Sequence, residues 1–127
     1  MRSKAIVVTN NASVNLLEQD QFVEGTLLDV LRRCRDLVHL GHQLISHPLV
    51  SSVKPNETPY KSVVLTKRGG SQVDFQSLSI IEASLQTAER MLGERPLCAY
   101  PERVLHDFQF IDRDLLETAL ASLPVSL

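Results

Sequence analysis

The chain has 127 residues, of which 43% are hydrophobic and 22% charged, and its formal net charge is −2. This length and apolar content predict one domain over residues 1–127 with a single core. Acidic and basic residues are mixed along the chain without a basic stripe, so nucleic-acid binding is not expected. The apolar run at residues 5–8 is too short for a signal peptide or a membrane span, and we expect a cytoplasmic protein without membrane contact.

The first third of the chain predicts two strands and a helix. Residues 4–9 form an apolar, β-branched run that ends in two asparagines, which is typical of a buried strand followed by a polar turn. Residues 21–25 predict a brief second strand. Residues 26–40 carry apolar side chains at helical spacing, with Thr26 as the N-cap and Gly41 placed to end the helix.

Two further strands are expected at residues 43–46 and 62–66. Strands that alternate with helices predict a layered α/β domain, in which helices flank a small, mostly parallel sheet of about four strands. If the last two strands are parallel, the segment between them must cross the whole sheet. If they are antiparallel, that segment stays at one end. The sequence leaves both alternatives open.

Helices are expected in the second half of the chain. The first covers residues 74–92, ends before Gly93 and packs on one face of the sheet. A short helix should run from Pro101 to about residue 107. Asp112 is expected to cap a last helix, in which four apolar residues face inward: Leu115, Leu116, Ala119 and Leu120.

The connection at residues 47–61 is the most informative part of the chain. It contains three prolines, Pro48, Pro55 and Pro59, among polar and charged side chains. Connections this long without helical periodicity are usually functional or disordered. Because each proline fixes its own φ and biases the residue before it toward extended geometry, we expect an ordered loop that presents side chains.

Candidate anion-binding residues lie at the predicted carboxyl ends of strands, where ligands gather in α/β sheets. Asn10 and Asn11 follow the first strand, and His47 follows the strand that precedes the loop. Lys54 and Lys61 can bind a carboxylate or a phosphate, to which the two asparagines can donate hydrogen bonds. The alternative is that the lysines are solvated and that the asparagines only form a turn.

Three other loop residues are candidates for a ligand or partner site. His47 and Glu57 can form an acid/base pair; alternatively, His47 bonds the loop backbone and Glu57 caps a turn. Tyr60, beside Asn56 and Glu57, either lines a pocket or partner surface or anchors the loop by packing. No complete catalytic motif is present, so whether the chain is an enzyme stays open.

No metal or cofactor is expected. The imidazoles of His39, His42, His47 and His106 lack the spacing of a metal site. The Gly69-Gly70 pair follows a strand without the rest of a phosphate-binding loop and is read as a turn. Cys34 and Cys98 belong to no metal or redox motif. We expect the Cys34 thiol to be buried and favour a packed thiol for Cys98, with a partly exposed one as the alternative.

Several stretches of the chain stand out together: Val8-Thr9-Asn10-Asn11, Leu28-Asp29-Val30-Leu31, Arg35-Asp36-Leu37-Val38-His39, His47-Pro48-Leu49, the run from Ser52 to Ser62, and Asp107-Phe108-Gln109-Phe110-Ile111-Asp112. They resemble the GrdX family, small proteins encoded beside the glycine, sarcosine and betaine reductase genes of amino-acid-fermenting bacteria. The resemblance extends from about residue 4 to about residue 116. It implies a genomic context but no catalytic residue.

Two functions are therefore weighed. The first is a non-catalytic accessory or assembly factor of an amino-acid reductase system, with reductase components as partners. The second is a protein or modest enzyme that binds a small anionic ligand. An accessory protein should bury Asn56, Glu57 and Tyr60 against a partner, whereas a ligand binder should bring them together with Asn10 and His47 around a pocket. A homodimer is a further open alternative.

Overall fold

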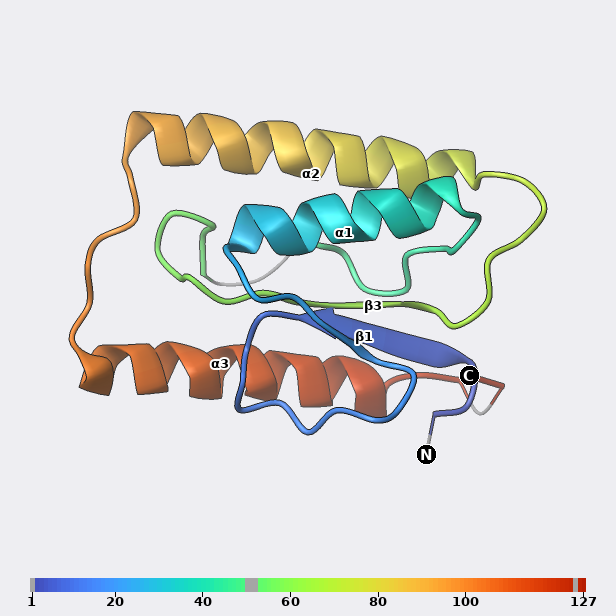
Figure 1. Cartoon of the computed structure of the whole chain (residues 1–127), viewed down its shortest axis with the longest axis horizontal. Helices are drawn as coiled ribbons and strands as arrows, with labels where there is room; N and C mark the ends of the chain where they lie inside the picture. The colour runs from blue at the N-terminus through green and yellow to red at the C-terminus, as the bar shows by residue number, and fades with distance from the viewer. Residues whose placement is uncertain (1, 50–52, 125) are drawn as a thin grey trace.

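A small sheet lies between α1 and α3 in the computed structural model, and α2 packs chiefly against α1 (Figure 1). The structure describes residues 2–49, 53–124 and 126–127. Its elements in chain order are β1 (Ala5–Thr9), β2 (Gln21–Phe22), α1 (Leu27–His39), β3 (Ser62–Thr66), α2 (Phe75–Glu94) and α3 (Glu102–Ala121). No helix within the described ranges is long and apolar enough to cross a membrane.

The sheet has three strands in the order β2-β1-β3 and is mixed. β1 and β3 are antiparallel, with Ala5 opposite Thr66 and Thr9 opposite Ser62, and β2 pairs in parallel with only the last two residues of β1. The α/β class is confirmed. The prediction of about four mostly parallel strands is wrong, because the longest pairing is antiparallel and one expected strand does not form.

The missing strand is the segment at residues 43–46, which runs along the outer edge of β3. Leu44 forms a single antiparallel bridge with Leu65, and the Ile45 N–H donates to the Val64 carbonyl (2.8 Å). The Val64 N–H donates instead to the Ser46 hydroxyl (2.8 Å), so a side chain replaces the backbone carbonyl that a longer ladder needs. The antiparallel alternative is confirmed, and the proline loop stays at one end of the sheet.

Apolar side chains of β1 alternate between two faces of the sheet, as the period of a strand requires. Ile6 and Val8 join the larger core with α1 and α2, whereas Ala5 and Val7 face α3 together with Leu116. The apolar face predicted for α1 is confirmed, since six of its residues are buried: Leu27, Val30, Leu31, Cys34, Leu37 and Val38.

The two thiols have different surroundings. Cys34 is buried, as expected, and burial raises the pKa of its thiol, which makes the reactive thiolate scarce. The expectation that Cys98 is packed is wrong, because this thiol is exposed in the connection between α2 and α3.

α1 begins and ends where the sequence predicts. The Thr26 hydroxyl accepts from the Asp29 N–H (3.2 Å), and the Asp29 carboxylate accepts from the Thr26 N–H (2.9 Å), which is a reciprocal capping box. After the helix Gly41 has a φ of +98°, a left-handed conformation that glycine adopts without steric cost.

Gly41→Ala is expected to lower the free energy of unfolding by about 1–3 kcal/mol, because a Cβ there combines an unfavourable φ with a close approach. That Cβ would lie 2.3 Å from the Gly70 carbonyl oxygen. Gly93→Ala is the matched control, since Gly93 lies in the last turn of α2 with nothing within 4 Å of its Cβ position. Thermal unfolding should show a lower midpoint for Gly41→Ala alone; equal midpoints for the two variants would contradict the argument.

Two helix predictions need correction. α2 begins close to the predicted position, with Asp74 as its N-cap, but it continues through Gly93 to Glu94, because an exposed glycine near a helix end is tolerated. α2 also packs on α1 rather than covering the sheet directly. The expected short helix and the separate last helix are one continuous helix, α3, in which Asp112 is a buried interior residue instead of a cap.

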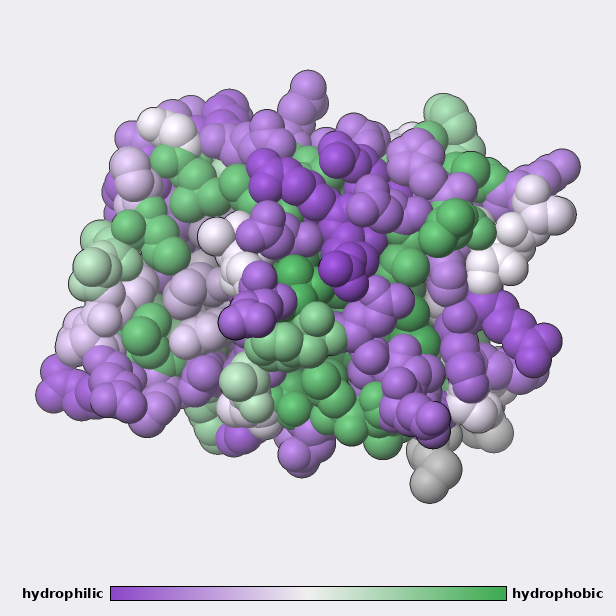
Figure 2. Space-filling view, viewed as in Figure 1, coloured by the Kyte–Doolittle hydropathy of each residue, from purple (hydrophilic) through white to green (hydrophobic). Residues whose placement is uncertain are grey.

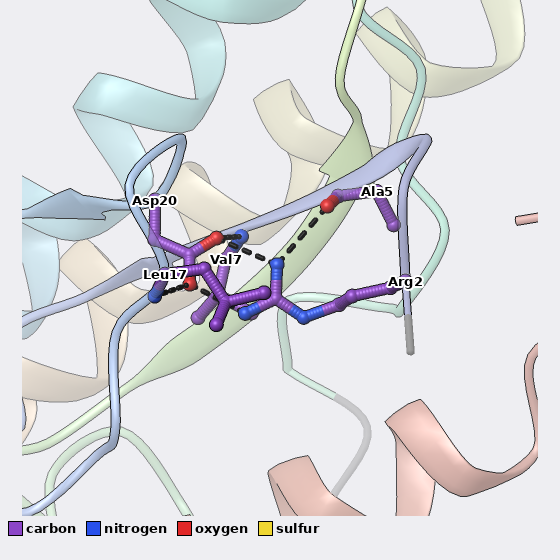
Figure 3. A network of polar contacts seen from close by, with 5 residues as sticks. All are labelled: Arg2, Ala5, Val7, Leu17 and Asp20. Carbon is purple, nitrogen blue, oxygen red and sulfur yellow. Dashed lines mark hydrogen bonds and ion pairs between the residues drawn. The ribbon is translucent and has the colours of Figure 1, made fainter.

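A buried ion pair fastens the N-terminus to the β1–β2 connection (Figure 3). The Arg2 guanidinium donates to both carboxylate oxygens of Asp20 and to the Ala5 carbonyl (3.0 Å). The Asp20 carboxylate also accepts from the Val7 N–H (2.9 Å) and the Leu17 N–H (2.8 Å). Because β2 is too short to reach Val7, this carboxylate takes the place of a strand partner.

The two ends of the described chain meet at the Ala5 end of β1 (Figure 1). The carbonyl oxygen of Leu127 accepts from the N–H groups of Ser3 (3.1 Å) and Lys4 (3.2 Å). These two bonds join the N-terminal and C-terminal segments at the Ala5 end of β1, whereas the proline loop enters β3 at the opposite end of the sheet.

Candidate functional site

The middle of the proline loop is bonded to its own domain. The Lys54 carbonyl accepts from the Glu57 N–H (2.9 Å), and the Glu57 carboxylate accepts from the Lys54 N–H (2.8 Å), which closes a turn. Asn56 is buried and donates to the Met91 carbonyl of α2 (3.1 Å), while the Tyr100 hydroxyl donates to the Glu57 carbonyl (2.8 Å). The Asn56 Oδ1 is buried without a hydrogen-bond partner in the described ranges.

Asn10 holds the end of the loop against the sheet. Its amide donates to the carbonyls of Gly25 (3.0 Å) and Pro59 (2.9 Å), and its Oδ1 accepts from the Lys61 N–H (2.9 Å). All three hydrogen bonds go to backbone groups of segments far apart in the sequence. Asn10 therefore positions Lys61, and its own amide is already occupied by the fold.

His47 and Glu57 satisfy the local alternative rather than forming an acid/base pair. The exposed His47 accepts the Leu49 N–H on Nδ1 (3.1 Å), which leaves Nε2 as the protonated nitrogen of the neutral ring. The Glu57 carboxylate is used by the turn at Lys54. Lys54 itself has an exposed side chain.

A chain of hydrogen bonds leads across the sheet to Asp112 of α3. The Asn11 N–H donates to Thr9 Oγ1 (2.9 Å), the Thr9 and Ser62 hydroxyls are 2.7 Å apart, and Ser62 Oγ donates to Asp112 Oδ2 (2.7 Å). An ionised carboxylate only accepts, so the Ser62 proton points to Asp112 and the Thr9 proton points to Ser62. Asn11 Nδ2 also donates to Asp112 Oδ2 (3.0 Å) and to the Gln109 carbonyl (2.9 Å).

Lys61 lies beside this network and is 8% exposed. Its side chain has no hydrogen bond or ion pair among the described residues, although Asp112 is near enough for its charge to act on the ammonium. Burial lowers the pKa of Lys61, and the Asp112 carboxylate opposes part of that change. A buried amine without an ion-pair partner is uncommon, because lysines are seldom buried unless paired.

Lys61, Asp112 and Ser62 line a cleft of about 170 Å³ at the seam between α3 and the end of β3. Its other lining residues are Ser46, His47, Leu115, Leu116 and Ala119. The Ser46 hydroxyl accepts from the Val64 N–H, and its own proton has no acceptor in the described part of the chain. A narrower cleft on the other side of Lys61 and Asp112, of about 10 Å³, is lined in part by Tyr60, Ile111 and Leu115.

The structure brings some of the predicted residues together. Lys61 and His47 line one cleft, Lys61 and Tyr60 line the narrower one, and Asn11 reaches the site through Asp112. The remaining predicted residues, Asn10, Lys54, Asn56 and Glu57, are bonded to backbone or lie outside both clefts.

Sequence reasoning missed Asp112, Ser62 and Ser46 as site residues. A usable signal was present for Asp112, which lies four residues before Leu116 and so on the inward face of the helix. A charged side chain on that face needs a buried partner, and its partners here come from the ends of β1 and β3. No three His, Cys, Asp or Glu side chains converge as metal ligands within residues 2–49, 53–124 and 126–127.

A separate and larger groove, of about 790 Å³, lies between the β1–β2 connection and the C-terminal half of α3. Most of its lining is apolar and includes Val14, Leu17, Leu116 and Leu120. Hydrophobic side chains gather over the part of the molecule where α3 and the β1–β2 connection lie (Figure 2).

The family model described as GrdX-like protein matches residues 6–121, which is nearly the whole chain. No curated protein and no solved structure matches the chain.

Proposed function

Because this chain belongs to the GrdX-like family, we propose that it is a non-catalytic accessory or assembly factor of an amino-acid reductase system for glycine, sarcosine or betaine. The observation that carries the proposal is an apolar surface on α3. Phe110, Ile111 and Leu115 are 59%, 37% and 39% exposed and lie on one side of the helix. Burying such side chains against a partner stabilises a complex by about 25 cal/mol for each Å² of apolar surface.

The surface has the residue types that dominate the energy of protein interfaces. Tyr60 lines the narrow cleft beside Ile111 and Leu115, and the Arg113 guanidinium lies 5.7 Å from the centre of the Phe110 ring. Tyrosine and arginine are enriched among the residues that contribute most to binding. We call these five residues, Tyr60, Phe110, Ile111, Arg113 and Leu115, the α3 surface.

The sequence-based proposal placed the partner on Asn56, Glu57 and Tyr60. Asn56 is already buried against α2, and Glu57 closes a turn. A partner that does not unfold the loop therefore cannot reach the Asn56 side chain, whereas Glu57 and Tyr60 are both partly exposed. This moves the proposed contact from the loop to the α3 surface.

Affinity purification of the tagged protein from its native host tests the proposal. The Phe110→Ala/Leu115→Ala variant should lose co-purifying reductase subunits, identified by mass spectrometry, that the wild type retains. Phe75→Ala is the matched control, because Phe75 is 80% exposed at the start of α2, away from this surface. Equal recovery by wild type and double variant would remove the α3 surface, and no recovery by the wild type would remove the accessory role.

A second candidate function is the binding of a small carboxylate or phosphate. The specific observation in its favour is that His47 and Lys61, which has no ion pair among the described residues, line one cleft. The Asp112 carboxylate lines the same cleft and opposes an anion. Thermal unfolding with acetate, inorganic phosphate and acetyl phosphate tests this candidate, since a ligand at 100 times its Kd stabilises by about 2.7 kcal/mol. Lys61→Met should abolish the stabilisation.

A further inference from the structure

The charges of Lys61 and Asp112 suit a neutral polar molecule better than an anion. Both side chains line the same cleft, so the ammonium that would attract an anion is offset by the carboxylate that repels it. Burial, however, favours the neutral form of an amine, which is the nucleophilic form, and a carboxylate in the same cleft can relay the protons of an addition to a carbonyl group.

We propose that Lys61 forms an imine with the carbonyl carbon of a small aldehyde or ketone bound in the cleft that it shares with Asp112 and Ser62. This goes beyond an accessory role and does not depend on it. The geometry behind it is an amine that is buried, unpaired and at the wall of a cleft, with a carboxylate held in place beside it.

The amine is available because the fold gives it no permanent partner. Its backbone is fixed by Asn10, which accepts the Lys61 N–H, but its side chain has no hydrogen bond or ion pair in the described part of the chain. The lowered pKa that burial causes increases the neutral fraction, and only the neutral amine attacks a carbonyl. The three other lysines, Lys4, Lys54 and Lys67, are exposed.

Asp112 supplies the proton transfers. Asp112 shares no ion pair with Lys61 in the described ranges, so in the first step it takes a proton from the Lys61 ammonium through one water molecule in the cleft. The neutral nitrogen then adds to the carbonyl carbon while one of its protons passes to the carbonyl oxygen, which gives a carbinolamine. In the second step the C–O bond breaks, the hydroxyl leaves as water with a proton returned by Asp112, and the C=N bond forms. The hydrogen bonds from Ser62 and Asn11 fix the carboxylate for both transfers.

The cleft limits the size of the carbonyl compound. A cleft of about 170 Å³ is smaller than the roughly 300–1,000 Å³ of pockets that hold drug-sized ligands, which favours a small carbonyl compound. Leu115, Leu116 and Ala119 form an apolar wall for an alkyl group. Ser46 lines the same cleft, and its O–H is a donor that can polarise the carbonyl oxygen.

Reductive trapping tests the inference on the wild-type protein. Acetaldehyde and sodium cyanoborohydride are added at neutral pH, and ethylation of each lysine is followed by peptide mass spectrometry. Lys61 should be ethylated faster than the exposed Lys54 and Lys67, by about tenfold for each unit by which its pKa is lowered. Ethylation of Lys61 no faster than these two lysines would overturn the proposal.

The pH dependence of Lys61 ethylation in Asp112→Asn, with Lys61→Arg as a control, is a second measurement that a change in packing alone would not alter. Three titratable groups line the two clefts together with Lys61. They are Asp112 on α3, His47 at the start of the loop, and Tyr60, which directly precedes Lys61 in the chain. Because the Asp112 charge raises the pKa of Lys61, its removal should shift the pH midpoint of ethylation to lower pH while slowing the maximal rate. Lys61→Arg should lose ethylation at position 61 and keep that of the other lysines. An unchanged rate and pH profile in Asp112→Asn would exclude its role.

The wild-type ratio of Lys61 to Lys54 and Lys67 requires no variant, so it decides the proposal even where Asp112→Asn does not fold. The outcome is also independent of the accessory role. Leu115 belongs to the α3 surface and also lines the Lys61 cleft. The two tests remain separate because subunit recovery is compared between wild type and the Phe110→Ala/Leu115→Ala variant, whereas the trapping ratio is measured on the wild type alone. Either result can fail while the other stands.

Discussion

Asp20→Asn is expected to lower the free energy of unfolding by about 3–5 kcal/mol, because removal of one partner leaves a buried charge uncompensated. The Arg2 guanidinium would lose its counter-charge (Figure 3). The carboxylate also accepts from two backbone N–H groups, of Val7 and Leu17, and an amide can accept with only one of its two heads. Urea denaturation measures the change.

The matched control is Asp36→Asn, an exposed residue of α1 that should change stability by less than about 0.5 kcal/mol. A loss for Asp20→Asn no larger than this control would show that the ion pair is dispensable. Arg2→Met should also lower the free energy of unfolding, because it leaves the buried Asp20 carboxylate without its counter-charge, although the Val7 and Leu17 N–H groups still donate to it.

The same carboxylate gives stability a pH dependence. Burial raises the pKa of Asp20, but the hydrogen bonds from Arg2, Leu17 and Val7 and the Arg2 charge outweigh it, so the folded pKa lies below the ordinary 3.8. The sign follows from linkage: the contribution is fully present above the unfolded pKa and is lost as pH falls through the folded one. Wild-type stability should therefore fall below about pH 4 more steeply than that of Asp20→Asn.

Asp112→Ala is expected to cost about 2–4 kcal/mol, because hydrogen bonds to a charged acceptor contribute about 1.5–3 kcal/mol each. Ser62 would keep its hydroxyl near Thr9 but lose its acceptor, whereas Asn11 would retain the Gln109 carbonyl. Asp114→Ala, two residues further along α3 and exposed, is the control and should be near neutral.

A double-mutant cycle with Ser62→Ala apportions this loss. The two residues share a 2.7 Å hydrogen bond, so their effects should be non-additive by about 0.5–3 kcal/mol. Additive losses would mean that Asp112 stabilises the protein through something other than the hydroxyl chain. Chemical denaturation of the four proteins supplies all the free energies needed.

α1 could be predicted closely because everything that defines it is local. Thr26 and Asp29 are three residues apart, Gly41 follows directly after the helix, and the apolar spacing lies within the helix itself. Caps and periodicity of this kind depend on neighbours along the chain, which a sequence displays. The general α/β class followed for the same reason.

The site could be predicted only in part, because its contacts are distant in the sequence. Asp112 looks like a helix cap from its neighbours, yet its acceptor oxygen binds Ser62, 50 residues away, and Asn11, 101 residues away. Lys61 was selected for its charge, but its burial depends on α3 closing over the end of β3. Asn56 was selected as a polar side chain of the loop that could bind a ligand or partner, but its amide donates to the Met91 carbonyl of α2.

Strand direction was similarly out of reach. A run of β-branched residues such as Ser62–Thr66 has the same composition in a parallel or an antiparallel pair. β3 is antiparallel because of its pairing with β1, which lies far away in the sequence. The Ser46 hydroxyl accepts from the Val64 N–H and so keeps the neighbouring segment from forming a longer ladder with β3.

The meeting of the two chain ends determines where an attached segment can stand. Ser3, Lys4 and Leu127 are bonded at the Ala5 end of β1, whereas Lys61 and Asp112 lie at the Thr9 end. The five residues of the strand separate these ends by about 13–17 Å. A short purification tag on either terminus is therefore attached at the Ala5 end of β1, opposite the end of the strand at which Lys61 and Asp112 lie.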